Sequence, residues 1–278
     1  ITERYAARPV GEVLQREMDP NRFIAGNGAW VGNGSQNSSG QAARATLKYS
    51  FPDDGVSWRD SGNLLNGAFE TRFGVGNIDR GREYVRQGLA AWRRIAGLSY
   101  NEVVDTNVPF SNSTSPVGGG DIRIGASTQG TSSGVLAYNF YPSAGGDMAI
   151  NASRLTSTGL LSSSNNYRYF RNVIAHEHGH GLGFGHPVPC TQTKLMEPFA
   201  STAFEMTQID EIRGAQVNYG DRFAGNNSVS TAKDFGNLTS PILKSIIERN
   251  LSTNGQFGPN GTSQDWFKFT LGSTQNVV

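Results

Sequence analysis

All four histidines of this 278-residue chain lie in one segment, "HEHGHGLGFGH" at 176–186. His176 and His180 are four residues apart, so on a helix their side chains project from the same face. Two imidazoles in this arrangement can bind one metal ion, and Glu177 lies far enough off that face to accept a proton from water on the metal. The segment therefore predicts a helix with metal-binding side chains on one face.

A glycine in the same segment allows the chain to turn and bring a third histidine to the metal ion. Gly183 can adopt the positive φ that ends a helix and turns the chain back, and His186 follows three residues later. Three protein ligands leave the fourth position of a tetrahedral zinc ion open, which is the arrangement of a catalytic site. We therefore predict one catalytic zinc, with His176, His180 and His186 as ligands and Glu177 as general base.

Met196 lies ten residues after His186, in "KLMEP" at 194–198. Together with the long histidine motif, this segment resembles the metzincin clan of zinc peptidases, in which a methionine turn lies beneath the zinc-binding histidines. The resemblance implies that Met196 forms this structural turn; an ordinary core methionine is the alternative. It also implies that Pro198 and Phe199 form part of the substrate pocket for the residue after the scissile bond.

Within the clan, the chain is most similar to matrixins over residues 42–221. "AAWRRIAGLSYNEV" (90–103), "DIRIGA" (121–126) and "GVLAYNFYPSAGGD" (134–147) resemble the first helix with its following strand, the next strand, and the rim of the matrixin cleft. The resemblance implies that an extended substrate pairs with the rim strand. The rim residues expected to bind it are Gly134, Val135, Leu136 and Ala137.

The chain departs from the matrixin pattern in the loop that follows the rim. Matrixins commonly bind a second, structural zinc there through histidines, whereas this chain has Tyr138 and Ala149 at those positions and no histidine outside 176–186. Counting thus excludes a second histidine-bound zinc. The Asp147 carboxylate and the carbonyls of the two preceding glycines would suit calcium, which needs only oxygen ligands. A plain glycine turn fits the same residues, so both interpretations stay open.

Hydrophobic periodicity and turn signals predict several strands followed by helices, which indicates an α+β domain. The predicted strands cover 45–51, 98–104, 121–126, 134–142 and 265–271, and the predicted helices cover 78–97, 166–183 and 207–220, the last with Thr207 as its N-cap.

The resemblance refines this to a metzincin-type zincin, with a mixed, mainly parallel sheet, an active-site helix and a C-terminal helix. We expect three regions along the chain. Residues 1–41 form an irregular arm, 42–221 the peptidase domain, and 222–278 an incomplete β-sandwich that resembles the start of a bacterial pre-peptidase C-terminal domain.

Composition bears on the binding partners of the protein and on its cellular location. The net charge of +1 gives no indication of nucleic acid or of an anionic membrane, and no apolar run is long enough to span a bilayer. Cys190 is the single cysteine and none lies in residues 1–40, so we expect no cysteine switch of the kind found in many matrixins. We interpret the chain, which begins at Ile1, as a mature or trimmed form of a secreted, extracellular bacterial protein.

The predicted function is that of a monomeric zinc endopeptidase acting on proteins or peptides. Two alternatives stay open. The first is a surface module that binds zinc without catalysis, although a mere metal holder would not need Glu177. The second is a zinc hydrolase whose substrate is not a peptide.

Overall fold

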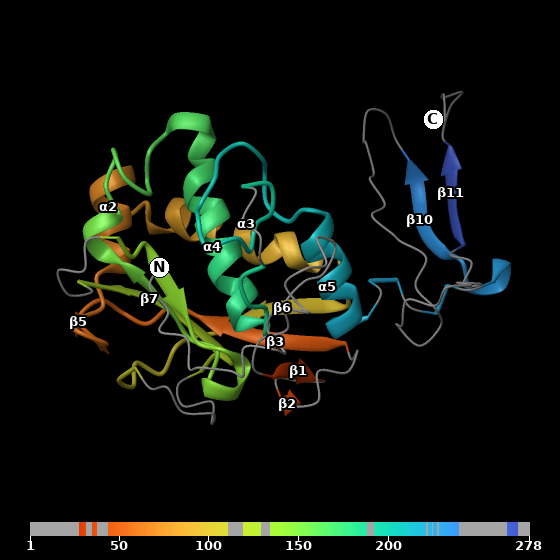
Figure 1. Cartoon of the computed structure of the whole chain (residues 1–278), viewed down its shortest axis with the longest axis horizontal. Helices are drawn as coiled ribbons and strands as arrows, with labels where there is room; N and C mark the ends of the chain where they lie inside the picture. The colour runs from red at the N-terminus through yellow and green to blue at the C-terminus, as the bar shows by residue number, and fades with distance from the viewer. Residues whose placement is uncertain are drawn as a thin grey trace, which may run out of the picture.

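A five-stranded sheet with helices against it forms the main body of the protein (Figure 1). The computed structural model describes residues 28–31, 35–37, 44–110, 119–128, 134–187, 192–220, 222–223, 225–226, 228–238 and 266–271.

The sheet is mixed and mainly parallel, as predicted. Its strand order is β6-β3-β7-β9-β8, with parallel pairing throughout except between β8 and β9, which are antiparallel. The inner strands β7 and β9 are buried along their whole length, as expected of parallel strands covered on both faces. The strands are β3 (Ala45–Ser50), β6 (Leu98–Glu102), β7 (Ile122–Ser127), β8 (Ala137–Asn139) and β9 (Met148–Asn151).

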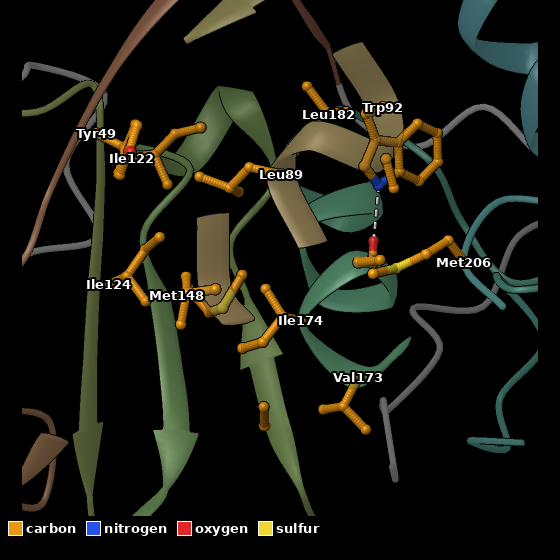
Figure 2. Packing of buried hydrophobic residues seen from close by; sticks show 14 of the residues in the cluster. Tyr49, Leu89, Trp92, Ile122, Ile124, Met148, Val173, Ile174, Leu182 and Met206 are labelled. Carbon is orange, nitrogen blue, oxygen red and sulfur yellow. Dashed lines mark hydrogen bonds between the residues drawn. The ribbon is translucent and has the colours of Figure 1, made fainter. Parts of the chain in front are cut away.

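Two helices pack side by side on this sheet, and Figure 2 shows their contact. They can approach closely because Gly88 has no side chain: a Cβ there would lie 2.6 Å from Cγ2 of Ile174. The indole Nε1 of Trp92 donates to the carbonyl of Ala175 at 2.8 Å and joins the two helices directly. These are α3 (Ile78–Arg93) and α4 (Arg168–Gly181); the other helices are α2 (Leu65–Phe73) and α5 (Ile209–Tyr219).

The hydrophobic core lies between this helix pair and the sheet. Figure 2 shows side chains from both layers pointing toward one another, and all of them are buried. The sheet contributes Ile122, Ile124 and Met148, and the helices contribute Leu89 and Ile174. The core therefore fixes the position of α4, the helix that carries the histidine segment.

Some predicted boundaries were wrong. The helix predicted to end at Gly97 ends at Arg93, because the next residues bury Ile95 and turn the chain into β6. The N-cap of α5 is Gln208 and not Thr207, since Gln208 forms a capping box with Glu211.

Within the main body of the protein, α2 and β9 were not predicted from the periodicity. The nine-residue α2 contains Gly67, and β9 is a run of four residues that resembles any short apolar segment. The predicted strand at 134–142 is confirmed only as the three-residue β8, after which Pro142 begins a 3₁₀ turn.

The N-terminal region contains a short hairpin where an irregular arm was expected. β1 (Ala29–Val31) pairs antiparallel with β2 (Ser35–Asn37), and the Trp30 side chain is 2% exposed. Other short elements are β4 (Ser57–Trp58), β5 (Ser61–Gly62) and the 3₁₀ turns η1 (Pro142–Ala144), η2 (Ala152–Arg154), η3 (Ser164–Tyr167) and η4 (Val229–Thr231).

Beyond α5, two strands pair in parallel: β10 (Lys233–Leu238) and β11 (Phe267–Leu271) (Figure 1). β11 confirms most of the strand predicted at 265–271. Rings of Phe223 and Phe235 pack at 5.5–5.8 Å from each other and from Phe267. The β-sandwich and the domain boundaries stay predictions. No helix among the described residues is both long and apolar enough to cross a membrane.

Candidate metal centre

The three predicted ligands come together at the C-terminal half of α4. Nε2 of His186 lies 3.2 Å from Nε2 of His176 and 3.0 Å from Nε2 of His180. Nitrogens that share one tetrahedral zinc ion, with bonds of about 2.0–2.1 Å, lie about 3.3 Å apart. These two distances, together with ligand atoms that all lie within 4.8 Å of one another, fit a single zinc ion.

Backbone carbonyls set the orientation of two of the rings. Nδ1 of His176 donates to the carbonyl of Leu195 at 2.6 Å, and Nδ1 of His180 donates to the carbonyl of Phe184 at 2.7 Å. A proton held on Nδ1 leaves the lone pair on Nε2, the atom that faces the other histidines. Both rings are thus held in the tautomer that a metal ligand needs.

Burial keeps the three imidazoles neutral. The side chains are 3–8% exposed, and loss of solvation lowers the pKa of His176, His180 and His186 to about 3. The neighbouring imidazole lowers the pKa of each ring further. Neutral imidazole is the form that binds metal, so the donor set fits zinc in its chemistry as well as its spacing.

Glycines shape the backbone around the cluster. Gly183 has φ +93, which confirms the predicted turn, and a Cβ there would collide with the carbonyl oxygen of Gly28. A Cβ at Gly179 would collide with the sulfur of Met196 and lie 2.8 Å from the ring of Trp92. Met196 therefore packs directly against the helix, one residue before His180.

A buried carboxylate that sequence reasoning missed holds this methionine. Glu211 of α5 accepts from the backbone N–H of Met196 at 3.0 Å and from that of Gln208 at 2.8 Å. Burial raises the pKa of Glu211. Its position three residues after a helix start gave a capping signal, but no local pattern indicates a contact with residue 196.

Glu177 and His178, the two residues of the histidine segment with ionisable side chains that are not predicted ligands, are buried on α4. Glu177 follows His176 directly and is 3% exposed. His178 is fully buried, and its Nε2 lies 2.7 Å from the hydroxyl of Tyr100, outside the three-histidine cluster. His178 thus packs against β6, as expected of a residue that is not a ligand.

The predicted rim leads into β8, at the edge of the five-stranded sheet. The backbone N–H of Asn151 donates to the carbonyl of Leu136 at 2.9 Å, and its side-chain amide donates to the carbonyl of Val135 at 2.8 Å. Ala137 is buried, whereas Gly134 is exposed. Asn151 therefore fixes the rim onto the neighbouring strand.

The predicted pocket residues follow the Met196 turn. Pro198 is half-buried and Phe199 is 61% exposed. The segment after them is tied to α4 by Asn172, whose amide nitrogen donates to the carbonyls of Ser201 at 2.8 Å and Phe204 at 3.0 Å. Asn172 has no local sequence signal, because its partners lie about 30 residues away.

In the loop after β8, protein donors contact the oxygens considered for calcium. The Asp147 carboxylate accepts from the backbone N–H of Arg123 at 2.8 Å, and the Gly146 carbonyl accepts from Asn139 Nδ2 at 2.8 Å. Burial raises the pKa of Asp147 to about 7. Calcium at this loop stays a prediction.

A family model described as matrixin matches residues 77–220. This match spans α3 to α5, including the histidine cluster and Met196. The chain belongs to the matrixin family. The predicted metzincin resemblance is thereby confirmed in its matrixin form, and the family together with the three-histidine cluster indicates a zinc cofactor.

A hatching enzyme from Paracentrotus lividus is similar to this matrixin. The two are 29% identical over 155 residues, which cover 55% of this chain and 24% of the relative. The chain therefore matches about a quarter of the relative's length.

Proposed function

We propose that this matrixin is a zinc-dependent endopeptidase, with His176, His180 and His186 as zinc ligands and Glu177 as the catalytic base. The observation that carries the proposal is the convergence of three buried, neutral imidazoles at a helix that also bears a buried glutamate. Nε2 of His186 lies 3.2 Å from that of His176 and 3.0 Å from that of His180. Family membership supports the same activity.

In this proposal, a bound zinc ion would polarise the scissile carbonyl and acidify the attacking water. Glu177 would accept a proton from that water and return it to the leaving amine, so one carboxylate would serve first as base and then as acid. Leu195 and Phe184 would support the chemistry through their carbonyls, which hold the rings of His176 and His180.

An extended peptide would bind by adding a strand to the edge of the sheet. Asn151 holds the carbonyls of Val135 and Leu136 on the β9 side, and we propose that the opposite edge of Gly134–Ala137 receives the substrate. Pro198 and Phe199 would form a wall of the pocket for the residue after the scissile bond.

The test is cleavage of casein and of a mixed peptide library by the wild type, by Glu177→Gln and by a chelated sample. We expect Glu177→Gln to bind one zinc per chain while cleavage falls about 10²–10⁴-fold, the usual contribution of general acid–base catalysis. Chelation should abolish cleavage, and added zinc should restore it. A wild type that binds one zinc but cleaves no peptide would contradict the proposal and favour a binding module or another hydrolase.

We also propose that the protein is secreted, as matrixins typically are. Detection of the mature protein in the culture medium of the source cells would test this.

We further propose that calcium binds at Asp147. Added calcium should then raise the melting temperature of the wild type and leave that of Asp147→Asn unchanged. Ultracentrifugation tests the predicted monomer.

A further inference from the structure

The turn between the second and third histidines is held from outside α4. The indole Nε1 of Trp30 donates to the carbonyl of Gly181 at 2.7 Å, and the hydroxyl of Tyr219 donates to the carbonyl of Leu182 at 2.6 Å. The carbonyl oxygen of Gly28 occupies the space that a side chain at Gly183 would need. Successive residues of the turn thus contact the N-terminal hairpin and α5.

These contacts form one buried unit. Trp30 is 2% exposed and Tyr219 is fully buried, and the backbone N–H of Trp30 donates to the Tyr219 hydroxyl at 3.4 Å. The benzene ring of the indole packs against the loop after β8, where a Cβ at Gly146 would lie 2.5 Å from Cζ2 of Trp30. The Trp30 ring therefore fills the space between this loop and the end of α4.

The two accepting carbonyls belong to the last turn of a helix, where backbone oxygens have no partner within the helix. A buried carbonyl left without a donor is unfavourable, so the turn would rearrange if Trp30 no longer supplied one. Such a rearrangement would reach the metal site, because Phe184 of the same turn accepts from Nδ1 of His180 and His186 follows two residues later.

We propose that Trp30 is a positioning residue for the zinc site. By holding the carbonyl of Gly181, it fixes the turn that orients His180 and delivers His186. Trp30 lies outside residues 77–220, the part that matches the matrixin family model. The N-terminal hairpin is thus part of the metal centre, and a chain cut between β2 and β3 would keep every ligand but hold them less rigidly. This inference rests on the proposed function, because it requires that the cluster binds zinc.

The decisive variant is Trp30→Phe, which keeps most of the buried aromatic surface but removes the N–H donor. The matched control is Trp58→Phe. Trp58 is also fully buried, but its Nε1 has no hydrogen-bond partner among the described residues, and its ring packs on Phe110 and Arg123, away from the turn. Zinc affinity is measured by competition with a chromogenic chelator, and the visible spectrum of the Co²⁺-substituted protein reports ligand geometry.

We expect Trp30→Phe to weaken zinc binding about 10-fold, the lower end of the effect of residues that orient metal ligands. Its Co²⁺ spectrum should change, and kcat should fall with KM unchanged because peptide pairing is not altered. Trp58→Phe should match the wild type in zinc affinity, Co²⁺ spectrum and kcat. Tyr219→Phe should shift the Co²⁺ spectrum as well, because it removes the donor to Leu182.

If Trp30→Phe equals Trp58→Phe in zinc affinity and Co²⁺ spectrum, the positioning role is wrong while the proposed peptidase function stands. If the wild type itself binds no zinc, the proposed function is wrong and this inference with it. Trp30→Ala would remove most of the buried ring and could prevent folding, whereas Trp30→Phe keeps most of that surface and decides between these outcomes.

Discussion

Two regions of this protein offer potential metal ligands, and they differ in where their lone pairs point. In the histidine cluster, protein carbonyls accept the Nδ1 protons of His176 and His180, so the Nε2 lone pairs of these two rings face Nε2 of His186. In the loop after β8, protein donors already point at the oxygens, as Arg123 does toward Asp147.

The comparison shows that the hydrogen bonds around the histidine cluster prepare it for a metal ion more completely than those around the loop after β8, where calcium stays a prediction. The surrounding hydrogen bonds must occupy the donor atoms and leave the acceptor atoms directed at one point. The loop after β8 is instead stabilised by aromatic contacts. Tyr138 and Phe140 pack edge to face at 5.7 Å, and the guanidinium of Arg59 lies 5.0 Å from the Tyr138 ring.

The largest expected effect is that of zinc removal. A ligand present at about 1,000 times its Kd stabilises the folded state by about 4 kcal/mol, so chelation should lower the melting temperature by many degrees. His186→Ala should abolish most of this drop in melting temperature, and Asp147→Asn should leave the drop intact. Calorimetry with and without chelator measures the melting temperatures. A second zinc per chain, detected by elemental analysis, would break the comparison.

The second effect is a pH dependence at Asp147. Its pKa is about 7 in the folded protein, chiefly because of burial, and lies near 3.8 when unfolded. Between these pH values the folded state holds a proton that the unfolded state has lost, so stability falls as pH rises, by up to about 1.4 kcal/mol per pH unit. Asp147→Asn should remove this slope, so the stability of the variant relative to the wild type should increase as the pH rises to 7.

Urea denaturation of both proteins from pH 4 to pH 8, in calcium-free buffer with zinc present, measures the slope. Parallel stability curves for the two proteins would show that the Asp147 carboxylate ionises normally. In that case it would be more available to a cation than the structure indicates.

A third effect concerns the contact between α4 and Met196. Gly179→Ala should destabilise the protein by about 2 kcal/mol, the usual penalty for overpacking a core, because the new methyl group collides with the Met196 sulfur. Gly134→Ala is the matched control, since no atom of the described residues lies within 4 Å of its Cβ position. Equal stability of the two variants, measured by thermal unfolding, would mean that Met196 is not tightly packed under the histidines.

The smallest effect is expected at Arg59. The side chain is exposed, so its contacts with the rings of Tyr138 and Phe140 should contribute about 0.5 kcal/mol. A double-mutant cycle of Arg59→Ala with Phe140→Leu isolates this coupling from the effects of each change. A coupling energy of zero would remove the contact between Arg59 and Phe140 as a reason for the stability of this loop.

Sequence periodicity predicted the elements that have a strong local signature. The helix that carries the histidines, the strand at Ala45–Ser50 and the glycine turn at Gly183 were all found where expected. The short β9 and α2 were missed because their patterns are too brief or too weakly amphipathic to stand out. The hairpin around Trp30 was missed because only two three-residue strands interrupt a segment rich in glycine and asparagine.

The sequence by itself determined which atoms could share a metal ion. The spacing of His176 and His180 on one helical turn, and a glycine three residues before His186, follow from local backbone geometry. The tertiary structure decided what holds those atoms in place. Trp30 and Gly181 are 151 residues apart, and Glu211 reaches Met196 from another helix. Such contacts leave no periodic signal, because they depend on how separate elements pack and not on how one segment folds.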